Sequence, residues 1–262
     1  MSGTVFSTYA SYYDLLYQDK DYARESDYVS ALLLRFHPEV GSVLELGSGT
    51  GRHAVLLAGK GYQLLGVERS TEMLARARAL IQASGARQAA GPHFPPEFVE
   101  GDIRSVRIDR GFDAAISLFH VISYQTTNAD LLQAFETARR HVRAGGLFVF
   151  DVWYGPAVLT DPPSTRVKRM ADELIEVTRL AEPVLLPNSN LVEVNYHVFV
   201  RTKATGSVSE TREKHEMRYL FVPEIDLLLG QSGFERLHAE EWLTGRTPGC
   251  GTWGVCFVAR RL

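Results

Sequence analysis

The stretch that most constrains the fold is Val43–His53, which reads Val-Leu-Glu-Leu-Gly-Ser-Gly-Thr-Gly-Arg-His. It begins as a short apolar run that carries Glu45, and it passes through three alternating glycines into residues 54–58, whose composition suits a helix. Glycines allow a tight turn and a close approach to a ligand, and a helix N-terminus offers unpaired N–H groups. The stretch therefore predicts a buried parallel strand, a glycine turn and a helix that together bind a nucleotide-like ligand.

The spacing of Gly47, Gly49 and Gly51 indicates the kind of ligand. A dinucleotide-binding fingerprint requires a glycine five positions after its first, where this chain has Arg52. The pattern Glu-x-Gly-x-Gly-x-Gly instead resembles motif I of the class I S-adenosylmethionine-dependent methyltransferases, whose glycine loop passes beneath the aminoacyl and ribose parts of the cofactor. A plain strand-to-helix turn, with glycines for tightness only, is the structural alternative.

Two further segments follow in the order of that family. Residues 62–67 predict a second strand, and Glu68 at its end is placed to accept hydrogen bonds from two ribose hydroxyls. Ser70 is then expected to cap the next helix. Residues 98–103 resemble the third family element, in which an acid, here Asp102, accepts from the adenine amino group. Three elements in this order are far more specific than any one of them.

The resemblance implies S-adenosyl-L-methionine as the cofactor and a set of residues that bind it. These residues come from the N-terminal segment, the glycine loop and the ends of the first four strands: Tyr17, Glu45, Gly47, Gly49, Gly51, Arg52, Glu68, Arg69, Met73, Asp102, Ile103 and Leu118. No metal ion is expected, because the end of the fourth strand lacks the carboxylate with which catechol-type methyltransferases hold Mg²⁺.

The segment after the fourth strand, residues 119–124, resembles the corresponding stretch of glycine and amino-sugar N-methyltransferases. His120 falls on the position that faces the substrate, and it is the candidate base because imidazole titrates near neutrality. Tyr124 falls where those relatives often have His. Tyr13 belongs to a tyrosine-rich N-terminal segment that resembles their lid, and Tyr13 and Tyr124 are expected to orient the acceptor. A structural core histidine is the alternative for His120.

The order of the elements predicts an α/β fold with a doubly wound, seven-stranded Rossmann-like sheet. Residues 1–152 are expected to form the cofactor-binding core with its N-terminal lid, and residues 223–262 to complete the core sheet. Residues 153–222 are too many for a simple connection. Their alternating pattern predicts an inserted antiparallel sheet of three strands, over Glu173–Leu180, Leu191–Thr202 and Val208–Phe221.

The inserted sheet and the net charge indicate which macromolecular partners the chain can have. Related methyltransferases carry such an insertion as a substrate lid and often as a dimer surface, so the resemblance implies a possible homodimer through it. A solvated meander with one packed face is the alternative. The net charge of −3, with acids and bases interspersed, disfavours a nucleic-acid partner, which usually requires a basic patch.

The remaining sequence features concern location. No apolar run has the length of a membrane span, and the N-terminus lacks a basic region followed by an apolar one. We therefore expect a cytoplasmic protein without a membrane partner.

The resemblance implies an enzyme that transfers a methyl group from S-adenosylmethionine to a nitrogen, or to an oxygen, of a small polar acceptor. A nucleotide-linked amino sugar or related saccharide is the leading acceptor. An amino-acid or other small-metabolite N- or O-methyltransferase is the alternative within enzymes. A non-catalytic scaffold or sensor that binds S-adenosylmethionine is the alternative from another class.

Overall fold

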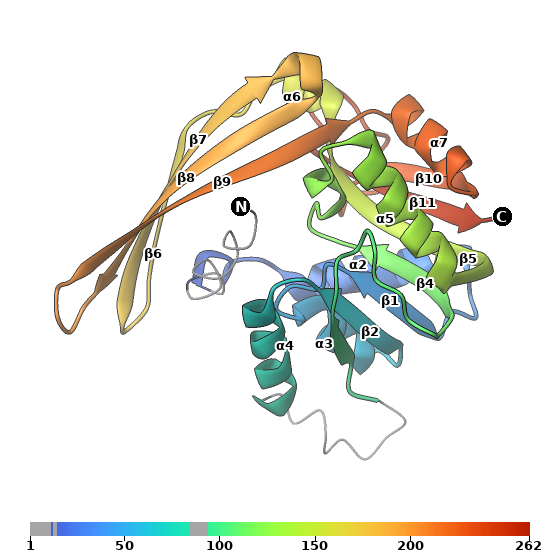
Figure 1. Cartoon of the computed structure of the whole chain (residues 1–262), viewed down its shortest axis with the longest axis horizontal. Helices are drawn as coiled ribbons and strands as arrows, with labels where there is room; N and C mark the ends of the chain where they lie inside the picture. The colour runs from blue at the N-terminus through green and yellow to red at the C-terminus, as the bar shows by residue number, and fades with distance from the viewer. Residues whose placement is uncertain (1–11, 13–14, 84–93) are drawn as a thin grey trace.

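The computed structural model describes residue 12 and residues 15–83 and 94–262 (Figure 1). Its elements in chain order are α2 (Tyr22–Phe36), β1 (Ser42–Leu46), α3 (Arg52–Gly59), β2 (Gln63–Glu68), α4 (Thr71–Ala83), β3 (Glu97–Glu100), β4 (Phe112–Ser117), η1 (Ile122–Tyr124), α5 (Asn128–His141), β5 (Val142–Tyr154), α6 (Gly155–Thr160), β6 (Arg166–Ala171), β7 (Ile175–Leu186), η2 (Pro187–Ser189), β8 (Leu191–Thr202), β9 (Val208–Leu220), α7 (Val222–Gln231), β10 (Phe234–Glu241) and β11 (Gly254–Arg261). The first strand, the glycine turn with its helix, and the second strand lie close to where the sequence predicts them.

Side chains at the helix starts explain several of these boundaries. The Asp21 carboxylate accepts a hydrogen bond from the Arg24 N–H at 2.9 Å and begins α2. Thr127 does the same for α5, where its hydroxyl accepts from the Asp130 N–H at 3.0 Å. The predicted cap at Ser70 is confirmed, because its hydroxyl accepts from the backbone N–H of Met73 at 3.2 Å.

The core sheet has the strand order β3–β2–β1–β4–β5–β11–β10. Neighbours from β3 to β5 are parallel, whereas β11 is antiparallel to both β5 and β10. This arrangement confirms the predicted α/β fold with a seven-stranded core. The strand order reverses at β1, and ligands of such sheets bind beyond the carboxyl ends of the strands at this point.

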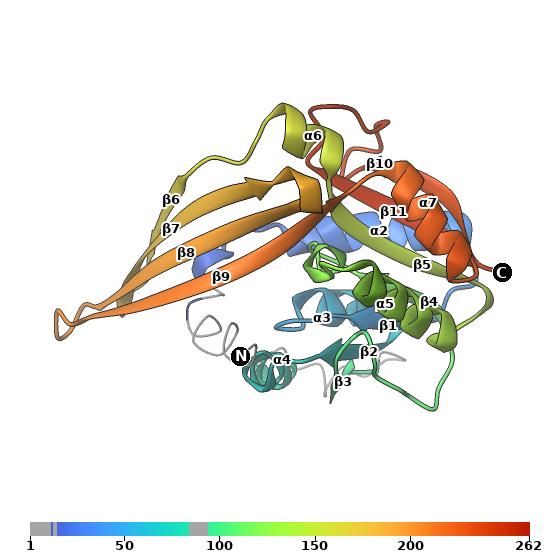
Figure 2. The ribbon, with the colours of Figure 1, turned by 45° about the horizontal axis from the view of Figure 1, so that its top comes forward.

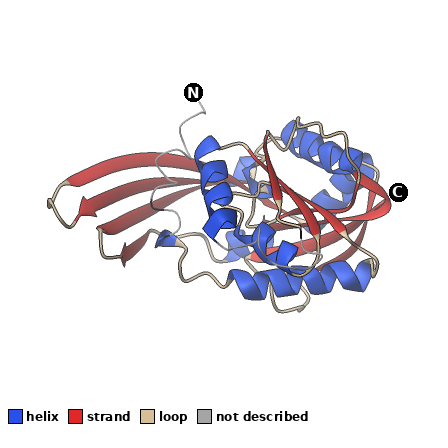
Figure 3. Cartoon of the chain, turned by 90° about the horizontal axis from the view of Figure 1, so that it is seen from below, coloured by secondary structure: helices blue, strands red, loops and turns tan. Residues whose placement is uncertain are grey.

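Two apolar layers sandwich the core strands, and helices lie on both sides of them in Figure 3. Side chains alternate between the layers, as the period of a strand requires. Val43 and Ile116 pack with α2 and α3, whereas Leu44 and Phe150 pack with α5 and α7. The core therefore holds the carboxyl ends of β1, β2 and β4 in fixed relative positions. No helix in the described part of the chain is long and apolar enough to cross a membrane.

The inserted region forms an antiparallel sheet with the order β9–β8–β7–β6. Its long strands extend away from the core in Figures 1 and 2. It joins the core sheet where Trp153 and Tyr154 of β5 pair in parallel with Tyr219 and Leu220 of β9.

The prediction of three inserted strands was wrong, because β6 (Arg166–Ala171) adds a fourth. This strand lies at the edge of the sheet, and its side chains are mostly exposed. Charged residues protect an exposed sheet edge from unwanted pairing. The same charges hide the apolar alternation from which a strand is predicted.

One face of β8 is apolar and buried, as the alternating pattern of the sequence predicts. Val198 belongs to the same buried cluster as Tyr12 and Met73, and Val192 to the same cluster as Tyr219. The inserted sheet therefore lies against the N-terminal segment and the start of α4, beside the carboxyl ends of the core strands.

Gly51 offers a test of how tightly the glycine turn packs on the sheet. A Cβ atom at Gly51 would lie 2.6 Å from the ring of Phe98 and 2.9 Å from Ala77, at a backbone φ of 75°. The left-handed backbone and the overpacking together predict that Gly51→Ala lowers the free energy of unfolding by about 2–5 kcal/mol. Denaturant unfolding of both proteins measures this difference.

Gly59→Ala is the matched control for this measurement. Gly59 ends the same helix, and a Cβ atom there would meet no atom within 4 Å. Its substitution is expected to leave stability unchanged or to raise it by up to about 1 kcal/mol. Equal effects of the two substitutions would contradict the packing of the turn.

Candidate active site

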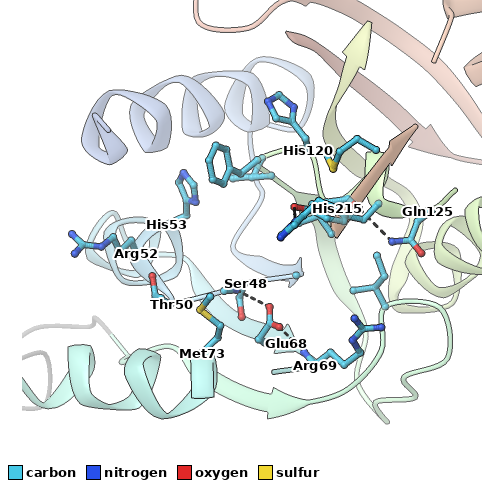
Figure 4. A pocket seen from close by; sticks show the side chains of 18 of the residues that line it. Ser48, Thr50, Arg52, His53, Glu68, Arg69, Met73, His120, Gln125 and His215 are labelled. Carbon is cyan, nitrogen blue, oxygen red and sulfur yellow. Dashed lines mark hydrogen bonds between the residues drawn. The ribbon is translucent and has the colours of Figure 1, made fainter. Parts of the chain in front are cut away.

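A pocket of about 490 Å³ lies at the carboxyl ends of the core strands, beside the inserted sheet (Figure 4). We call one part of its lining the glycine-loop half, which consists of Gly47, Ser48, Gly49, Thr50, Arg52, Glu68, Arg69, Met73 and residues 101–104. We call the other part the aromatic half, which consists of Phe119, His120, Val121, Tyr124, Gln125, Trp153, Tyr196, His215 and Met217. In Figure 4, Glu68, Arg69 and Met73 lie on one side of the cavity and His120 and His215 on the other. The volume suits one or two small molecules.

Gly49 and Gly51 of the glycine loop lack a side chain for different structural reasons. All three glycines of the loop have a positive φ, which is 82° at Gly47, 55° at Gly49 and 75° at Gly51. Gly49 lines the pocket, and a Cβ atom there would meet no protein atom within 4 Å. Its missing side chain therefore keeps space open for a ligand. Gly51 lies outside the pocket lining, and its missing side chain serves helix–sheet packing instead.

The carboxylate of Glu68 ties the end of β2 to the glycine loop. Its Oε2 atom accepts a hydrogen bond from the Gly49 N–H at 2.9 Å, and Oε1 accepts from the N–H groups of Arg69 and Ser70 at 2.9 and 2.8 Å. Glu68 also lines the pocket. The carboxylate of Glu68 thus lies in the pocket wall and holds the backbone of the glycine loop in place. The hydrogen bonds from ribose hydroxyls to Glu68 stay a prediction.

Asp102 is held in a fixed orientation by Arg104, a residue that the sequence analysis did not single out. The Arg104 side chain donates through Nε to Oδ1 at 2.9 Å and through Nη2 to Oδ2 at 2.6 Å. Its other Nη atom donates to Asp130 on α5 at 2.6 Å. These hydrogen bonds from Arg104 keep the pKa of Asp102 below its ordinary value, so the carboxylate is ionised where it lines the pocket.

Glu45 lies behind the glycine loop rather than in the pocket wall. Only 1% of its surface is exposed, its Oε2 atom has no hydrogen-bond partner, and Oε1 lies 3.9 Å from Nδ1 of His53. Burial raises the pKa of Glu45 to about 8, and the nearby charge of Glu68 adds to this effect. A buried, unpaired carboxyl group at this position favours a ligand that carries positive charge.

His120 is bound to a buried carboxylate, Asp151, at the carboxyl end of β5. Oδ2 of Asp151 lies 2.6 Å from Nδ1 of the imidazole, and both carboxylate oxygens accept from the His120 backbone N–H at 3.2 Å. The contact with Nδ1 has the distance of an ion pair but not the alignment of a hydrogen bond. A carboxylate at this distance still favours a proton on Nδ1, which leaves Nε2 as the nitrogen that can accept one. The ring of His120 lines the pocket.

The backbone at this point is strained. Phe119 and His120 both have a left-handed conformation, with φ values of 63° and 62°. For residues with side chains this costs about 1–3 kcal/mol each, and such strain clusters at functional sites. The hydrogen bonds to Asp151 hold the turn in place and so aim His120 at the pocket.

The N-terminal segment packs on this strained turn. The ring of Tyr17 meets that of Phe119 edge-on at 5.2 Å, and the ammonium group of Lys20 lies 3.6 Å from the centre of the Phe119 ring. Glu25 bridges Lys20 and His53, with distances of 2.7 Å to each. Burial keeps the pKa of His53 below its ordinary value. The segment is thus anchored to both α3 and the turn after β4.

The structure brings most of the predicted site residues together. All predicted cofactor residues except Glu45 and Gly51 line the pocket, as do His120 and Tyr124, whereas Tyr13 lies outside the described residues. Their individual roles stay predictions. The sequence analysis missed several pocket residues and the partner of His120: Ser48, Thr50, Arg104, Gln125, Trp153, Tyr196, Met217 and Asp151.

Of these missed residues, only Asp151 could have been singled out from the sequence, because it is a single acid inside the apolar run of residues 147–152. A charge in such a strand requires a partner. The described residues contain no group of three or more His, Cys, Asp or Glu side chains that could hold a metal ion.

Comparisons with known proteins identify the class of protein. Residues 43–146 match a family described as "Methyltransferase domain". The dTDP-3-amino-3,4,6-trideoxy-alpha-D-glucopyranose N,N-dimethyltransferase of Streptomyces venezuelae is 30% identical over 193 residues, which cover 72% of this chain and 76% of that protein. The putative methyltransferase YqeM of Bacillus subtilis (strain 168) is 25% identical over 259 residues, which cover 98% of this chain and 97% of that protein.

A solved structure shows the same fold over nearly the whole chain. It is an S-adenosylmethionine-dependent methyltransferase from Clostridium acetobutylicum ATCC 824, with a TM-score of 0.81 and 22% identity, covering 98% of both chains. The fold, the site and the relatives together define a methyltransferase. The chain belongs to the class I S-adenosylmethionine-dependent methyltransferases and is related to the sugar N,N-dimethyltransferases.

The described residues fit this cofactor. S-adenosylmethionine carries a sulfonium and an ammonium group, and the unpaired carboxyl group of Glu45 lies directly behind the loop that is expected to hold them. Gly49 leaves open space at the loop, and Glu68 and Asp102 present carboxylates at the ends of β2 and β3. The glycine-loop half therefore has the shape and the charge that the cofactor requires.

The pKa of Glu45 predicts a pH dependence of stability in the protein without cofactor. Between the ordinary glutamate value near 4.3 and about 8, folded Glu45 keeps a proton that the unfolded chain releases, so this group lowers stability as the pH rises. Glu45→Gln imitates the protonated form and removes this contribution. The melting temperature of the variant relative to wild type is therefore expected to increase from pH 5 to pH 8.

Melting curves of both proteins across this range test the prediction. Glu235→Gln, a substitution of an exposed acid on β10, serves as the control and is expected to follow wild type at every pH. A constant difference between Glu45→Gln and wild type would show that Glu45 is ionised in the folded protein.

Proposed function

We propose that the protein methylates the amino group of a small polar acceptor, and that a nucleotide-linked amino sugar is the acceptor class. The observation that carries the proposal is the pair of His120 and Asp151, which places a basic imidazole nitrogen in the aromatic half of the pocket, next to the glycine-loop half. The similarity to the amino-sugar N,N-dimethyltransferase of Streptomyces venezuelae supports a sugar-bound amine as the acceptor.

In this proposal the residues of the chain align the acceptor and remove its proton. The bound cofactor supplies an activated methyl group, so orientation of the attacking nitrogen carries most of the rate. Nε2 of His120 accepts the proton that the amine must lose, and the buried carboxylate of Asp151 stabilises the resulting imidazolium. Trp153 and Tyr196 form apolar walls that suit the face of a sugar ring and exclude water.

The aromatic half gives the acceptor a place of its own. It continues the same pocket beyond the glycine-loop half, and it contains groups that can donate and accept hydrogen bonds, among them Gln125 and Tyr124. This extra space favours an enzyme over a non-catalytic scaffold or sensor. Homodimer formation through the inserted sheet and a cytoplasmic location stay predictions.

A second candidate is a small amine metabolite without phosphate groups. Among the described residues, the lining of the aromatic half contains no Lys or Arg. A diphosphate bound there would lack the basic side chains that usually recognise it. Under the first candidate, the sugar ring therefore occupies the aromatic half and the nucleotide lies beyond it. Full-length similarity to the putative methyltransferase YqeM leaves this second acceptor class open.

Acceptor profiling tests the proposal. Purified protein is incubated with S-adenosylmethionine labelled in its methyl group and with three sets of acceptors, namely dTDP-linked 3-amino sugars, the corresponding free amino sugars, and amino acids. We expect turnover of the nucleotide-linked amino sugars at a kcat/KM at least about tenfold above that of the other sets, which corresponds to about 1.4 kcal/mol of additional transition-state binding. Preference for the unphosphorylated amines would favour the second candidate. Transfer to hydroxyl groups alone would contradict N-methylation.

A further inference from the structure

A second histidine–carboxylate pair lies on the inserted sheet, and its histidine forms part of the wall of the aromatic half. His215 of β9 is 3% exposed, and its Nε2 atom lies 3.2 Å from Oε2 of Glu213 on the same strand. Nδ1 of His215 lies 2.9 Å from the hydroxyl of Tyr124, which lines the pocket. On the far side of the pair, the Tyr12 hydroxyl donates to Oε1 of Glu213 at 3.1 Å.

These four side chains form one chain of hydrogen bonds across three separate parts of the fold. Tyr124 comes from η1 after β4, His215 and Glu213 come from the inserted sheet, and Tyr12 comes from the N-terminal segment. We propose that this chain fixes the hydroxyl of Tyr124 as a hydrogen-bond acceptor toward the substrate, so that Tyr124 selects and orients an N–H donor. The proposal rests on the proposed function, because an amine is such a donor.

The direction of the hydrogen bonds follows from the chemistry of the carboxylate. An ionised carboxylate can only accept, so the Nε2 atom of His215 must carry the proton that it shares with Glu213. The neutral ring then has a lone pair on Nδ1, which accepts the hydroxyl hydrogen of Tyr124. With its hydrogen directed at His215, the oxygen of Tyr124 can only accept further hydrogen bonds, and the side chain lines the pocket.

The environment keeps this direction fixed. Burial raises the pKa of Tyr124 well above its ordinary value, so its phenol stays protonated at neutral pH. Burial, with the nearby charge of Glu213, also raises the pKa of Tyr12 and keeps it a donor. Titratable and charged groups also approach from the neighbouring strands β8 and β7 and from the N-terminal segment: Tyr196, Arg179 and Tyr17.

Two consequences follow for the substrate. An acceptor nitrogen that donates an N–H to the Tyr124 oxygen has its lone pair directed elsewhere, toward the methyl group that it attacks. The same chain of hydrogen bonds also offers a second path for a proton, separate from Nε2 of His120. When an N–H proton passes to the Tyr124 oxygen, the hydroxyl proton passes to Nδ1 of His215, and the resulting imidazolium lies beside Glu213. No charge is lost or created in this transfer.

Nitrogen NMR of the histidine rings tests the direction of the chain without any acceptor. In ¹⁵N-labelled wild-type protein, the His215 signals, assigned from the spectrum of His215→Gln, are expected to show a proton on Nε2 and none on Nδ1 near pH 7.5. Glu213→Gln replaces the carboxylate, which can only accept a hydrogen bond, with an amide that can also donate one. We then expect the His215 proton to lie on Nδ1 or to be shared between Nδ1 and Nε2. A proton on Nδ1 in the wild type, or an unchanged Nε2 proton in Glu213→Gln, would overturn the proposal.

Kinetics with the acceptor that the wild type methylates tests the consequence. Tyr124→Phe keeps the ring and removes the hydroxyl, and it is expected to lower kcat about tenfold while the affinity for S-adenosylhomocysteine stays within about twofold. Wild-type kcat in Tyr124→Phe would overturn the orienting role. Absence of turnover of any amine by wild type would contradict the proposed function, whereas the NMR result would still decide the direction of the chain.

The same strand provides a matched control. Glu210 of β9 lies 2.6 Å from Nε2 of His197, and neither residue lines the pocket. Glu210→Gln therefore changes an equivalent histidine–carboxylate pair on the exposed side of the sheet. It is expected to leave both kcat and the position of the proton on His215 unchanged. Melting temperatures of all variants show whether each one is folded.

Discussion

The buried carboxylate of Asp151 is the interaction on which the arrangement of the site depends. It sits in the middle of the core sheet, where β5 is flanked by β4 and β11, and only 1% of its surface is exposed. An ionised group in such surroundings is destabilising unless it is paired. Here the partners are the backbone N–H and the imidazole of His120. His120 therefore compensates the buried charge of Asp151, and Asp151 in turn holds His120 in its strained left-handed conformation. The cost of burying the charge and the cost of the strain thus offset each other.

The same principle, a carboxylate that organises the backbone or ring next to it, recurs around the pocket. Glu68 holds the glycine loop, Asp102 is fixed by Arg104, and Glu213 orients His215. Each of these acids lies at a strand end or on a strand, so the sheet sets its position. The pocket walls are therefore held by contacts within the protein itself, which reduces the cost of ordering them during catalysis. The inserted sheet contributes to this organisation, because His215 and Tyr196 form part of the pocket wall.

The sequence predicts the features of this protein that are local. The apolar run of β1, the glycine spacing, the acid at the end of β2 and the cap at Ser70 all depend on neighbouring residues, and the structure has each of them. Edge strand β6 was missed because its charged side chains conceal the alternation of a strand. The pairs of His120 with Asp151 and of Tyr124 with His215 join residues 31 and 91 positions apart. Pairings of this kind are set by strand order and by the fold of the insertion, which no local pattern encodes.

The most direct test of this account is the turnover of Asp151→Asn, measured together with its affinity for S-adenosylhomocysteine. The amide still fills the space but no longer stabilises an imidazolium, so kcat is predicted to fall about 10²-fold or more, with the dissociation constant within about threefold of wild type. Asp113→Asn is the control, because Asp113 bonds Ser42 at the amino end of β4, away from the pocket lining. It is predicted to keep wild-type kcat. Wild-type turnover in Asp151→Asn would contradict the central role of this carboxylate.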